Sequence, residues 1–404
     1  MAGFERRAEG AAVGGGVLYC AEFMSGRIDH VTLCTVLTPA HVALASLNQQ
    51  IVTGLNRGPI RWSVTYNPEF RDPSGARQAG EPPTPLADLM GPGATVRLGP
   101  TLEQTFERVF SGSEAAQPDS VERRRLLGKY IGSYHHAAGL RLALEDVRTR
   151  FAILIDPDFY VVRRGWIDDV LSYMAAEGMA VFGAPWSPRW YQKYRSFPST
   201  HLMVIDLQRC PWAKAGLEPD LIAGGRRFAS DTWSRLAAGS KAEKGMAMAE
   251  IFRNPWRAIR EDLRQRTDIG AARDTGYALL ERCRRRPEIK IGLLQPVFDP
   301  RERFMPDAVS PLQIHPLVEA LMPPSRRYLP SRSSYFSRKG FESFGLRSVR
   351  GQGWEEFLWK GQPFATHVRG ELQRARSGSI DPEHVRETLN AVLIGLDLLG
   401  LQPL

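Results

Sequence analysis

Residues 151–160, FAILIDPDFY, carry the strongest clue to the architecture of this chain. Five apolar residues that are typical of a buried strand end abruptly at Asp156-Pro157-Asp158. Two carboxylates directly after a buried strand are costly to desolvate unless a cation balances them. The stretch is therefore either an acidic turn, in which one carboxylate caps the next segment, or a seat for a divalent metal ion.

Strand and helix patterns alternate on both sides of this stretch. Apolar or alternating runs predict strands at 31–38, 59–68, 94–100, 150–159, 179–188, 199–208 and 289–299, the last one central. Helical periodicity predicts helices at 40–56, 120–147 and 165–178. The strand-helix-strand order at the start implies parallel strands with a right-handed crossover. The sequence thus predicts an α/β domain with a mostly parallel central sheet flanked by helices.

This domain is expected to span residues 30–300. Residues 1–29 are rich in Gly and Ala and are interpreted as a mobile lead-in. Residues 301–404 form a C-terminal extension, in which 354–370 predicts a strand or hairpin that packs back and 382–402 an amphipathic helix. In an open α/β sheet, ligands bind beyond the carboxyl ends of the strands, where Asp156 and Asp158 are expected.

The bulk composition favours anionic partners and a reducing compartment. The 404 residues carry a formal charge of +9, which suits nucleotide diphosphates, lipid phosphates or nucleic acid. Arginine clusters such as those at 122–125 and 281–286 are most simply solvated helix faces. None of the four cysteines lies in a C-x-x-C pair, so we expect neither zinc nor disulfides and predict a cytoplasmic location. No signal peptide or transmembrane helix is expected.

The segment 135–171, HHAAGLRLALEDVRTRFAILIDPDFYVVRRGWIDDVL, resembles the GT-A glycosyltransferases. The resemblance is closest to bacterial family-2-like members and extends over about residues 30–300. It implies a Rossmann-like GT-A fold and transfer of a sugar, such as a hexose, from a nucleotide-diphosphate sugar to a glycan, a lipid or another hydroxyl acceptor. It also implies a Mn²⁺ or Mg²⁺ cofactor bound by a D-x-D motif.

The resemblance assigns roles to residues at the ends of several predicted strands. Asp156 lies toward the donor and, with Asp158, toward the metal. Thr38 and Asn67 map to the positions that contact the base, with Asn67 replacing the acidic residue that is common there. His367 would complete the metal's ligands, although a lone histidine is also often a structural hydrogen-bonding residue. His135 and His136 either touch the diphosphate or have a surface or core role.

An inverting member needs a general base for the acceptor hydroxyl, and a carboxylate suits that task. Asp274, in RDTGYALLERC, lies where the family places this base. Asp is also a favoured helix N-cap, and the two roles are compatible. Asp262 and Asp268 are nearby competitors for the role of base.

The segment 183–206 is rich in aromatic and basic residues and links two predicted strands. Aromatic faces stack on sugars and cationic side chains neutralise phosphates, so we predict an acceptor wall there. Simple packing of the loop by large aromatic residues is the alternative. The acceptor candidates are Trp186, Arg189, Trp190 and His201.

Two other classes of protein compete with the glycosyltransferase interpretation. A nucleotidyltransferase would need a glycine-rich basic loop after the first strand, and TPAHVALAS offers none. A non-catalytic protein on a degenerate GT-A fold could bind polyanions or a membrane surface through the basic clusters and the last helix, although that helix lacks a basic polar face. Peripheral binding to the inner face of the membrane and a homodimer are compatible with the sequence; specific nucleic-acid binding is not expected.

Overall fold

The computed structural model describes residues 30–71, 77–79, 86–91, 93–110, 121–187, 193–194, 196–219, 274–298, 336–350, 354–368 and 381–398, with single positions between 242 and 253. Within these residues, no helix is long and apolar enough to cross a membrane. Of the four cysteines, Cys34, Cys210 and Cys283 lie in the described part, and all three are buried free thiols.

The centre of the molecule is a seven-stranded mixed sheet. Its strands are β1 (Val31–Leu37), β2 (Arg61–Tyr66), β5 (Thr95–Leu98), β6 (Phe151–Ile155), β8 (Met179–Pro185), β9 (Pro198–Asp206) and β10 (Lys290–Leu293). They lie in the order β10-β8-β9-β6-β1-β2-β5. Neighbouring strands are parallel except around β9, which runs antiparallel to β6 and β8. This arrangement confirms the predicted α/β class and the mostly parallel sheet.

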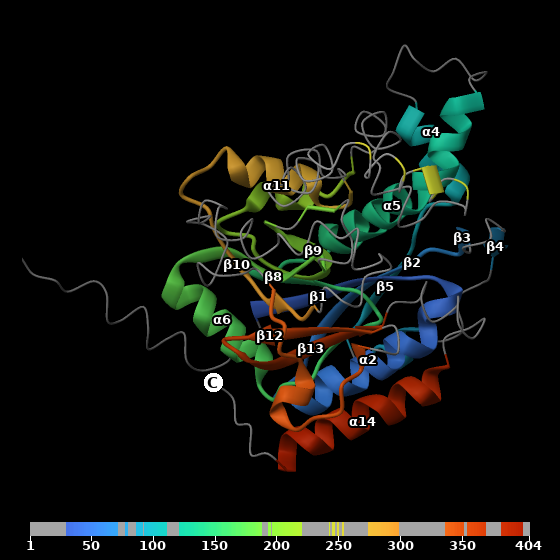
Figure 1. Ribbon diagram of the computed structural model, residues 1–404. Coiled ribbons are helices and arrows are strands. Elements are labelled where there is room, and N and C mark those ends of the chain that lie inside the picture. Colours follow the sequence, from blue (N-terminus) through green and yellow to red (C-terminus); the bar gives the residue numbers. More distant parts are fainter. Residues whose placement is uncertain are drawn as a thin grey trace, which may run out of the picture.

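Helices cover both faces of this sheet (Figure 1). Helices α2 (Val42–Leu55) and α6 (Trp166–Glu177) pack on one face, and α5 (Val121–Glu145) and α11 (Tyr277–Arg284) on the other. Successive residues of a strand point to opposite faces. In β6, Ile153 and Ile155 therefore join the core on the α2 side, and Ala152 and Leu154 the core on the α5 side. A strand that is buried on both faces explains the unbroken apolar run before Asp156.

A second, antiparallel sheet brings the C-terminal part of the chain back to the acidic motif. Its strands are β11 (Gln295–Pro296), β12 (Trp354–Trp359), β13 (Gln362–Val368) and β7 (Phe159–Val161), in that order. β7 directly follows Asp158, and β13 pairs with it. The predicted fold-back of 354–370 is thus a hairpin in a sheet that also contains residues from before position 300.

The last helix, α14 (Pro382–Leu398), packs on its own domain. Its residues Val385, Leu389, Val392 and Leu396 are buried in a cluster that includes Leu44 and Leu47 of α2. In Figure 1, α14 lies beside α2 on the side away from α5. The apolar stripe of this helix is therefore covered by the same chain.

Three predicted segments differ from the structure. The strand expected at 289–299 is split into β10, at an edge of the main sheet rather than its centre, and β11 of the second sheet. The split has a backbone cause, because Pro296 has no N–H with which to continue the ladder. Two further segments, for which the sequence predicted neither helix nor strand, also contain elements. Residues 69–93 contain β3 (Glu69–Arg71), β4 (Arg77–Ala79) and α3 (Leu86–Leu89), and α4 (Leu102–Phe110) follows the predicted strand at 94–100.

Candidate functional site

The candidate site lies where the strand order of the main sheet reverses. From β1 the chain moves outward through β2 and β5, and it then returns to the other side of β1 as β6. The crevice beyond the carboxyl ends of β1 and β6 is the place at which ligands bind in open α/β sheets. Thr38 follows β1 and Asp156 follows β6, so both stand at this crevice.

The turn that carries the two carboxylates is fixed by neighbours on both sides. The Asp156 N–H donates to the His201 carbonyl at 2.9 Å, which continues the pairing of β6 with β9. The Val368 N–H donates to the Asp158 carbonyl at 2.9 Å, which continues the pairing of β7 with β13. The Asn48 amide of α2 donates to the Asp156 and Phe159 carbonyls at 3.2 and 2.9 Å. The turn is therefore held in one conformation by three separate elements.

Two histidines converge on these carboxylates. His201 Nε2 lies 3.7 Å from Asp156 Oδ2, and His367 Nε2 lies 3.4 Å from Asp158 Oδ1. The two imidazole centroids are 4.4 Å apart. One ligand atom each of Asp156, His201 and His367 falls within 4.8 Å of the others. The structure thus brings together Asp156, Asp158 and His367, the three candidate metal ligands named from the sequence, and adds His201.

The hydrogen bonds behind the rings set which nitrogen faces the carboxylates. Glu355 Oε2 lies 3.0 Å from His367 Nδ1; a carboxylate can only accept, so Nδ1 carries the proton. The Ser199 hydroxyl donates to the Ala184 carbonyl at 2.9 Å and so accepts from His201 Nδ1, also at 2.9 Å. In the neutral rings both Nε2 atoms are then lone-pair donors that point at carboxylate oxygens.

This donor set fits a divalent cation. Lone pairs of imidazole nitrogens facing carboxylate oxygens repel one another unless a proton or a metal ion lies between them. Carboxylate and imidazole donors together suit first-row transition metals, and buried carboxylates that orient ligating histidines are a regular feature of such sites. Asp156, Asp158, His201 and His367 are the residues that could hold the ion, with Glu355 and Ser199 behind them.

A third histidine lines the same group. His136 of α5 places Nε2 3.5 Å from Asp156 Oδ1. Desolvation by the surrounding protein, reinforced by His41 and His135, lowers the pKa of His136 to about 4, so this ring is neutral at pH 7. The neighbouring His135 is buried and bonds the Thr105 hydroxyl and the Glu69 carbonyl, both at 3.0 Å. Of the two, only His136 therefore has a place at the site.

Asp274 stands behind the cluster, two side chains away from His201. It forms an ion pair with Lys193, whose Nζ lies 4.7 Å from the Trp186 ring centroid. Trp186 in turn packs edge-on against the His201 ring at 4.3 Å. The Asp274 carboxylate also accepts the Thr275 N–H at 2.8 Å. Asp274 is not the N-cap of α11, because Gly276, with a φ of 88°, occupies that position.

The two residues predicted to contact the nucleotide base, Thr38 and Asn67, lie in different surroundings. The Thr38 hydroxyl is half-buried at the crevice, 2.9 Å from His41 Nδ1. Asn67 is only 1% exposed, and its amide donates to the His135 carbonyl at 3.3 Å. Gly99 and Gly139 pack closely against its amide oxygen. In the structure the buried Asn67 side chain ties the end of β2 to α5, and its contact with the nucleotide base stays a prediction.

The predicted acceptor wall falls partly outside the described residues. Arg189 and Trp190, and also the competitors Asp262 and Asp268, lie in the undescribed parts. Trp186 is 7% exposed and packs on His201, so it supports a histidine of the cluster instead of presenting an open stacking face. His201 faces the carboxylates. Both residues thus belong to the candidate metal site.

The basic side chains at 281–286 contact other residues of their own domain. Arg282 donates to the Trp212 carbonyl at 3.1 Å, and the Arg286 guanidinium lies 4.6 Å from the Trp212 ring centroid. Arg284 pairs with Glu281 at 2.9 Å. The side chains of the cluster at 122–125 lie outside the described residues. No observation on the described residues favours a polyanion-binding face.

Comparisons with solved structures return glycosyltransferases among their matches, all at low TM-scores. No protein-family profile matches the sequence, and no curated protein matches it. Among solved structures, mouse xyloside xylosyltransferase 1 is 11% identical with a TM-score of 0.32, over 66% of this chain and 85% of that one. An active-site mutant of LgtC is 14% identical with a TM-score of 0.27, over 46% and 64%. The mannosyltransferase PcManGT of Pyrobaculum calidifontis, in complex with GDP-Man and Mn²⁺, is 11% identical with a TM-score of 0.28, over 59% and 86%. These values are low, so the proposed function rests on the site itself.

Proposed function

We propose that this protein is a metal-dependent glycosyltransferase that moves a sugar from a nucleotide-diphosphate sugar to a hydroxyl acceptor. The observation that carries the proposal is the convergence of Asp156, Asp158, His201 and His367 at the switch point of an α/β sheet. Mn²⁺ and Mg²⁺ in such crevices commonly share their ligands between carboxylates and substrate phosphates. The site therefore suits a substrate that carries a diphosphate.

The four side chains would hold the cation, and the cation would supply positive charge for the leaving nucleoside diphosphate. Mn²⁺ is favoured over Mg²⁺, because Mg²⁺ strongly prefers oxygen ligands whereas two of the donors here are imidazole nitrogens. Glu355 and Ser199 would keep both Nε2 atoms turned inward. Asp156 would also face the donor's ribose, with Thr38 beside the base and the neutral His136 ring as a hydrogen-bonding neighbour.

Asp274 is proposed to act on the acceptor side, as the base of an inverting transfer. Its carboxylate is 4% exposed and is paired with Lys193, so the acceptor hydroxyl would have to approach beside this pair. A general base must reach the proton that it accepts within hydrogen-bonding distance. Lys193 would then also stand close enough to the cluster to attract the donor's phosphates. The acceptor would be a glycan or a lipid-linked glycan, with Arg189 and Trp190 as candidates to contact it.

The proposed cellular location and assembly of the protein rest on the sequence. Cysteine usage supports the cytoplasm, and a lipid-linked acceptor would bring the protein to the inner face of the membrane. The apolar stripe of α14 is buried against α2, so it is not exposed for contact with a membrane or a second copy. The proposal therefore assigns no membrane or dimer contact to α14.

A thermal-shift screen of nucleotide sugars, each with Mn²⁺, with Mg²⁺ and with EDTA, tests the function. One donor is expected to raise the melting temperature, more with Mn²⁺ than with Mg²⁺ and not with EDTA. Asp158→Asn should abolish this shift and lower the transfer rate by about 100-fold or more, since the cation supplies several kcal/mol. Asp88→Asn, which removes an exposed carboxylate of α3, is the matched control and should change neither.

The stereochemistry of the transfer product tests the role of Asp274 separately. NMR of the product should show an inverted anomeric centre; retention would remove Asp274 as base while leaving the transfer itself in place. If every nucleotide sugar fails to shift the protein and Asp158→Asn binds Mn²⁺ as tightly as the wild type, the proposed function is wrong.

A further inference from the structure

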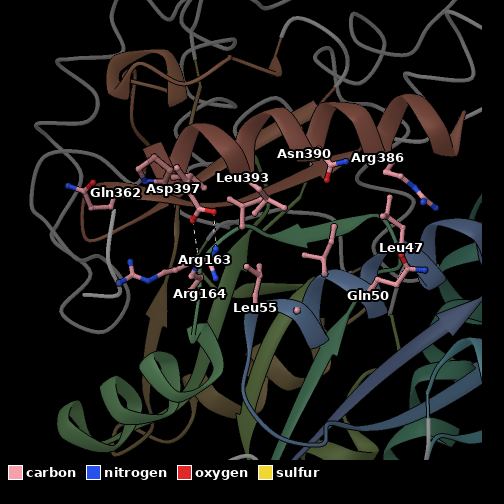
Figure 2. Close-up of a pocket in the computed structure, with 15 residues that line it drawn as sticks. Leu47, Gln50, Leu55, Arg163, Arg164, Gln362, Arg386, Asn390, Leu393 and Asp397 are labelled. Atoms are coloured by element: carbon pink, nitrogen blue, oxygen red, sulfur yellow. Dashed lines mark hydrogen bonds and ion pairs between the residues drawn. The ribbon is translucent and has the colours of Figure 1, made fainter. Parts of the chain in front are cut away.

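A second cavity lies away from the metal cluster, between α2 and α14. Its volume is about 600 Å³, within the range of small-molecule sites. Figure 2 shows α14 on one side and α2 on the other, with the end of β7 and the start of β13 closing one end. The lining residues taken up below are Gly54, Leu55, Arg163, Arg164, Leu393 and Asp397.

Gly54 forms part of the wall of this cavity. It is the next-to-last residue of α2, and glycine is a poorer helix former than alanine. A Cβ atom on Gly54 would meet no atom within 4 Å, so close packing does not explain it. Gly395 of α14 is different, because a Cβ there would come within 2.8 Å of Leu346. The space in front of Gly54 is therefore open, and a larger side chain at this position would occupy part of the cavity.

The cavity combines an apolar middle with charged ends. Leucine and isoleucine side chains of α2 face those of α14 across its centre, as Leu55 and Leu393 do in Figure 2. Arg163, Arg164 and Asp397 gather at one end and Arg386 lies at the other. The lining residues themselves, three arginines and one aspartate, carry a formal charge of +2, and the partners Asp169 of Arg163 and Glu383 of Arg386 lie outside the lining.

Arg163 supplies a donor that the described protein leaves unsatisfied. Its side chain is 7% exposed, and its Nε donates to Asp169 Oδ2 at 3.1 Å. The Nη2 group is buried and has no hydrogen-bond partner among the described residues. Burial lowers the pKa of this arginine, since a charge is costly to desolvate. Because Nη2 is covered by protein and the guanidinium lies over the Trp359 ring at 5.2 Å, an anion in the cavity would offset the charge of Arg163 through space, without a hydrogen bond to Nη2.

We propose that the cavity binds a small anionic amphiphile, a molecule with one phosphate or carboxylate group and an apolar chain. The anionic group lies at the end formed by Arg163 and Arg164, and the chain lies between the leucines of α2 and α14. Arg164 is held at the mouth by Asp397 at 2.8 Å, an exposed pair that can open at little cost.

This site is separate from the proposed donor site. None of the cavity's lining residues belongs to the metal cluster, although α2, β13 and the end of β7 border both. Binding at the cavity needs neither metal nor nucleotide sugar. The proposal therefore stands or fails independently of the proposed function.

Isothermal titration of the full chain, in EDTA and without nucleotide, tests it with four probes. Decyl phosphate and decanoate are used below their micelle concentrations and are expected to bind with 1:1 stoichiometry. The neutral n-decanol should bind at least about tenfold more weakly, and inorganic phosphate should not bind detectably. Tighter binding of decyl phosphate or of decanoate identifies which headgroup the site prefers.

Two variants of the same kind locate the site. Gly54→Leu places a side chain in the cavity and should weaken decyl phosphate binding by about tenfold or more, while the better helix former leaves the melting temperature equal or higher. Gly132→Leu, on α5, is the matched control: Gly132 is also exposed, with no atom within 4 Å of a Cβ, but lies outside the cavity. It should bind as the wild type does.

A third variant tests the anionic end. Arg164→Gln should lower the affinity for decyl phosphate toward that for n-decanol and leave n-decanol binding unchanged. The proposal is overturned if the wild type binds none of the amphiphiles, if Gly54→Leu binds as well as Gly132→Leu, or if n-decanol binds as tightly as the two anions.

Discussion

The two faces of the hairpin β12–β13 carry adjacent glutamates with different tasks. Glu355 points toward the main sheet and bonds His367 at 3.0 Å, next to the metal cluster. Glu356 points the other way and accepts the N–H groups of Phe341 and Val349 at 2.8 and 2.9 Å. Both carboxylates are buried. Burial of a charge alone therefore does not mark a functional residue; the group that it contacts does.

This contrast predicts opposite phenotypes for neighbouring substitutions. Changes on the Glu355 face should alter metal binding and leave the fold intact, whereas changes on the Glu356 face should alter stability and leave the intrinsic affinity of the folded protein for metal unchanged. A pair of variants with identical phenotypes would break the contrast.

The largest expected effect is that of Glu356→Ala on stability. The change would leave two buried N–H groups and the Ser348 hydroxyl, which lies 3.0 Å from the carboxylate, without this acceptor. It would also remove one of two carboxylate partners of Arg350, the other being Glu342. Loss of one partner of a buried charged network costs about 3–5 kcal/mol. We expect the melting temperature to fall by on the order of 10 °C in scanning calorimetry.

Glu356→Gln is the control for this loss, because its amide oxygen retains one acceptor at the same place. It should lose less stability than Glu356→Ala, and both variants should bind Mn²⁺ as the wild type does at temperatures where they are folded. An unchanged melting temperature in Glu356→Ala would mean that the contacts of the 341–349 segment contribute nothing to stability.

A smaller effect is expected for Glu355→Gln. The amide still accepts from His367 Nδ1, but without the negative charge that makes the ring a better ligand. Loss of such a supporting carboxylate typically lowers metal affinity by about 10–100-fold. Titration calorimetry with Mn²⁺ should show this loss, with a melting temperature close to that of the wild type in EDTA. If stability falls and Mn²⁺ affinity does not, Glu355 is a structural residue like its neighbour.

The sequence predicted the carboxylates and His367 but not Glu355, and the reason lies in the hairpin register. Trp359 pairs with Gln362 across a two-residue turn, and a regular ladder from there would place Glu355 opposite Thr366. An irregularity between Phe357 and Leu358 shifts the register by one residue, so that Glu355 faces His367 instead. Periodicity predicts a hairpin, but it does not predict a bulge.

The sequence predicts His201 near the crevice as an acceptor contact, whereas the structure turns its ring toward Asp156. The apolar run of β6 identified a central strand, and Asp156 at its end followed from that. The antiparallel direction of β9 could not be read from a run of buried residues, because parallel and antiparallel central strands have the same pattern. Only that direction places the start of β9, and with it His201, beside the end of β6.

The smallest expected effect is a pH dependence confined to the Glu356 face. Burial raises the pKa of Glu356 above its ordinary value of 4.5, against the opposing influence of the Phe341 and Val349 N–H groups and of Arg350. The folded state therefore holds this proton to a higher pH than the unfolded state does. The wild type should therefore lose stability relative to Glu356→Gln as pH rises from about 4.5 through the raised pKa. The total loss is about 1.4 kcal/mol for each pH unit between the unfolded-state pKa and the folded-state pKa. Melting curves of both proteins between pH 4 and 8 measure the difference; a difference that grows in favour of the wild type with rising pH would mean that the amide donors outweigh burial and lower the pKa instead.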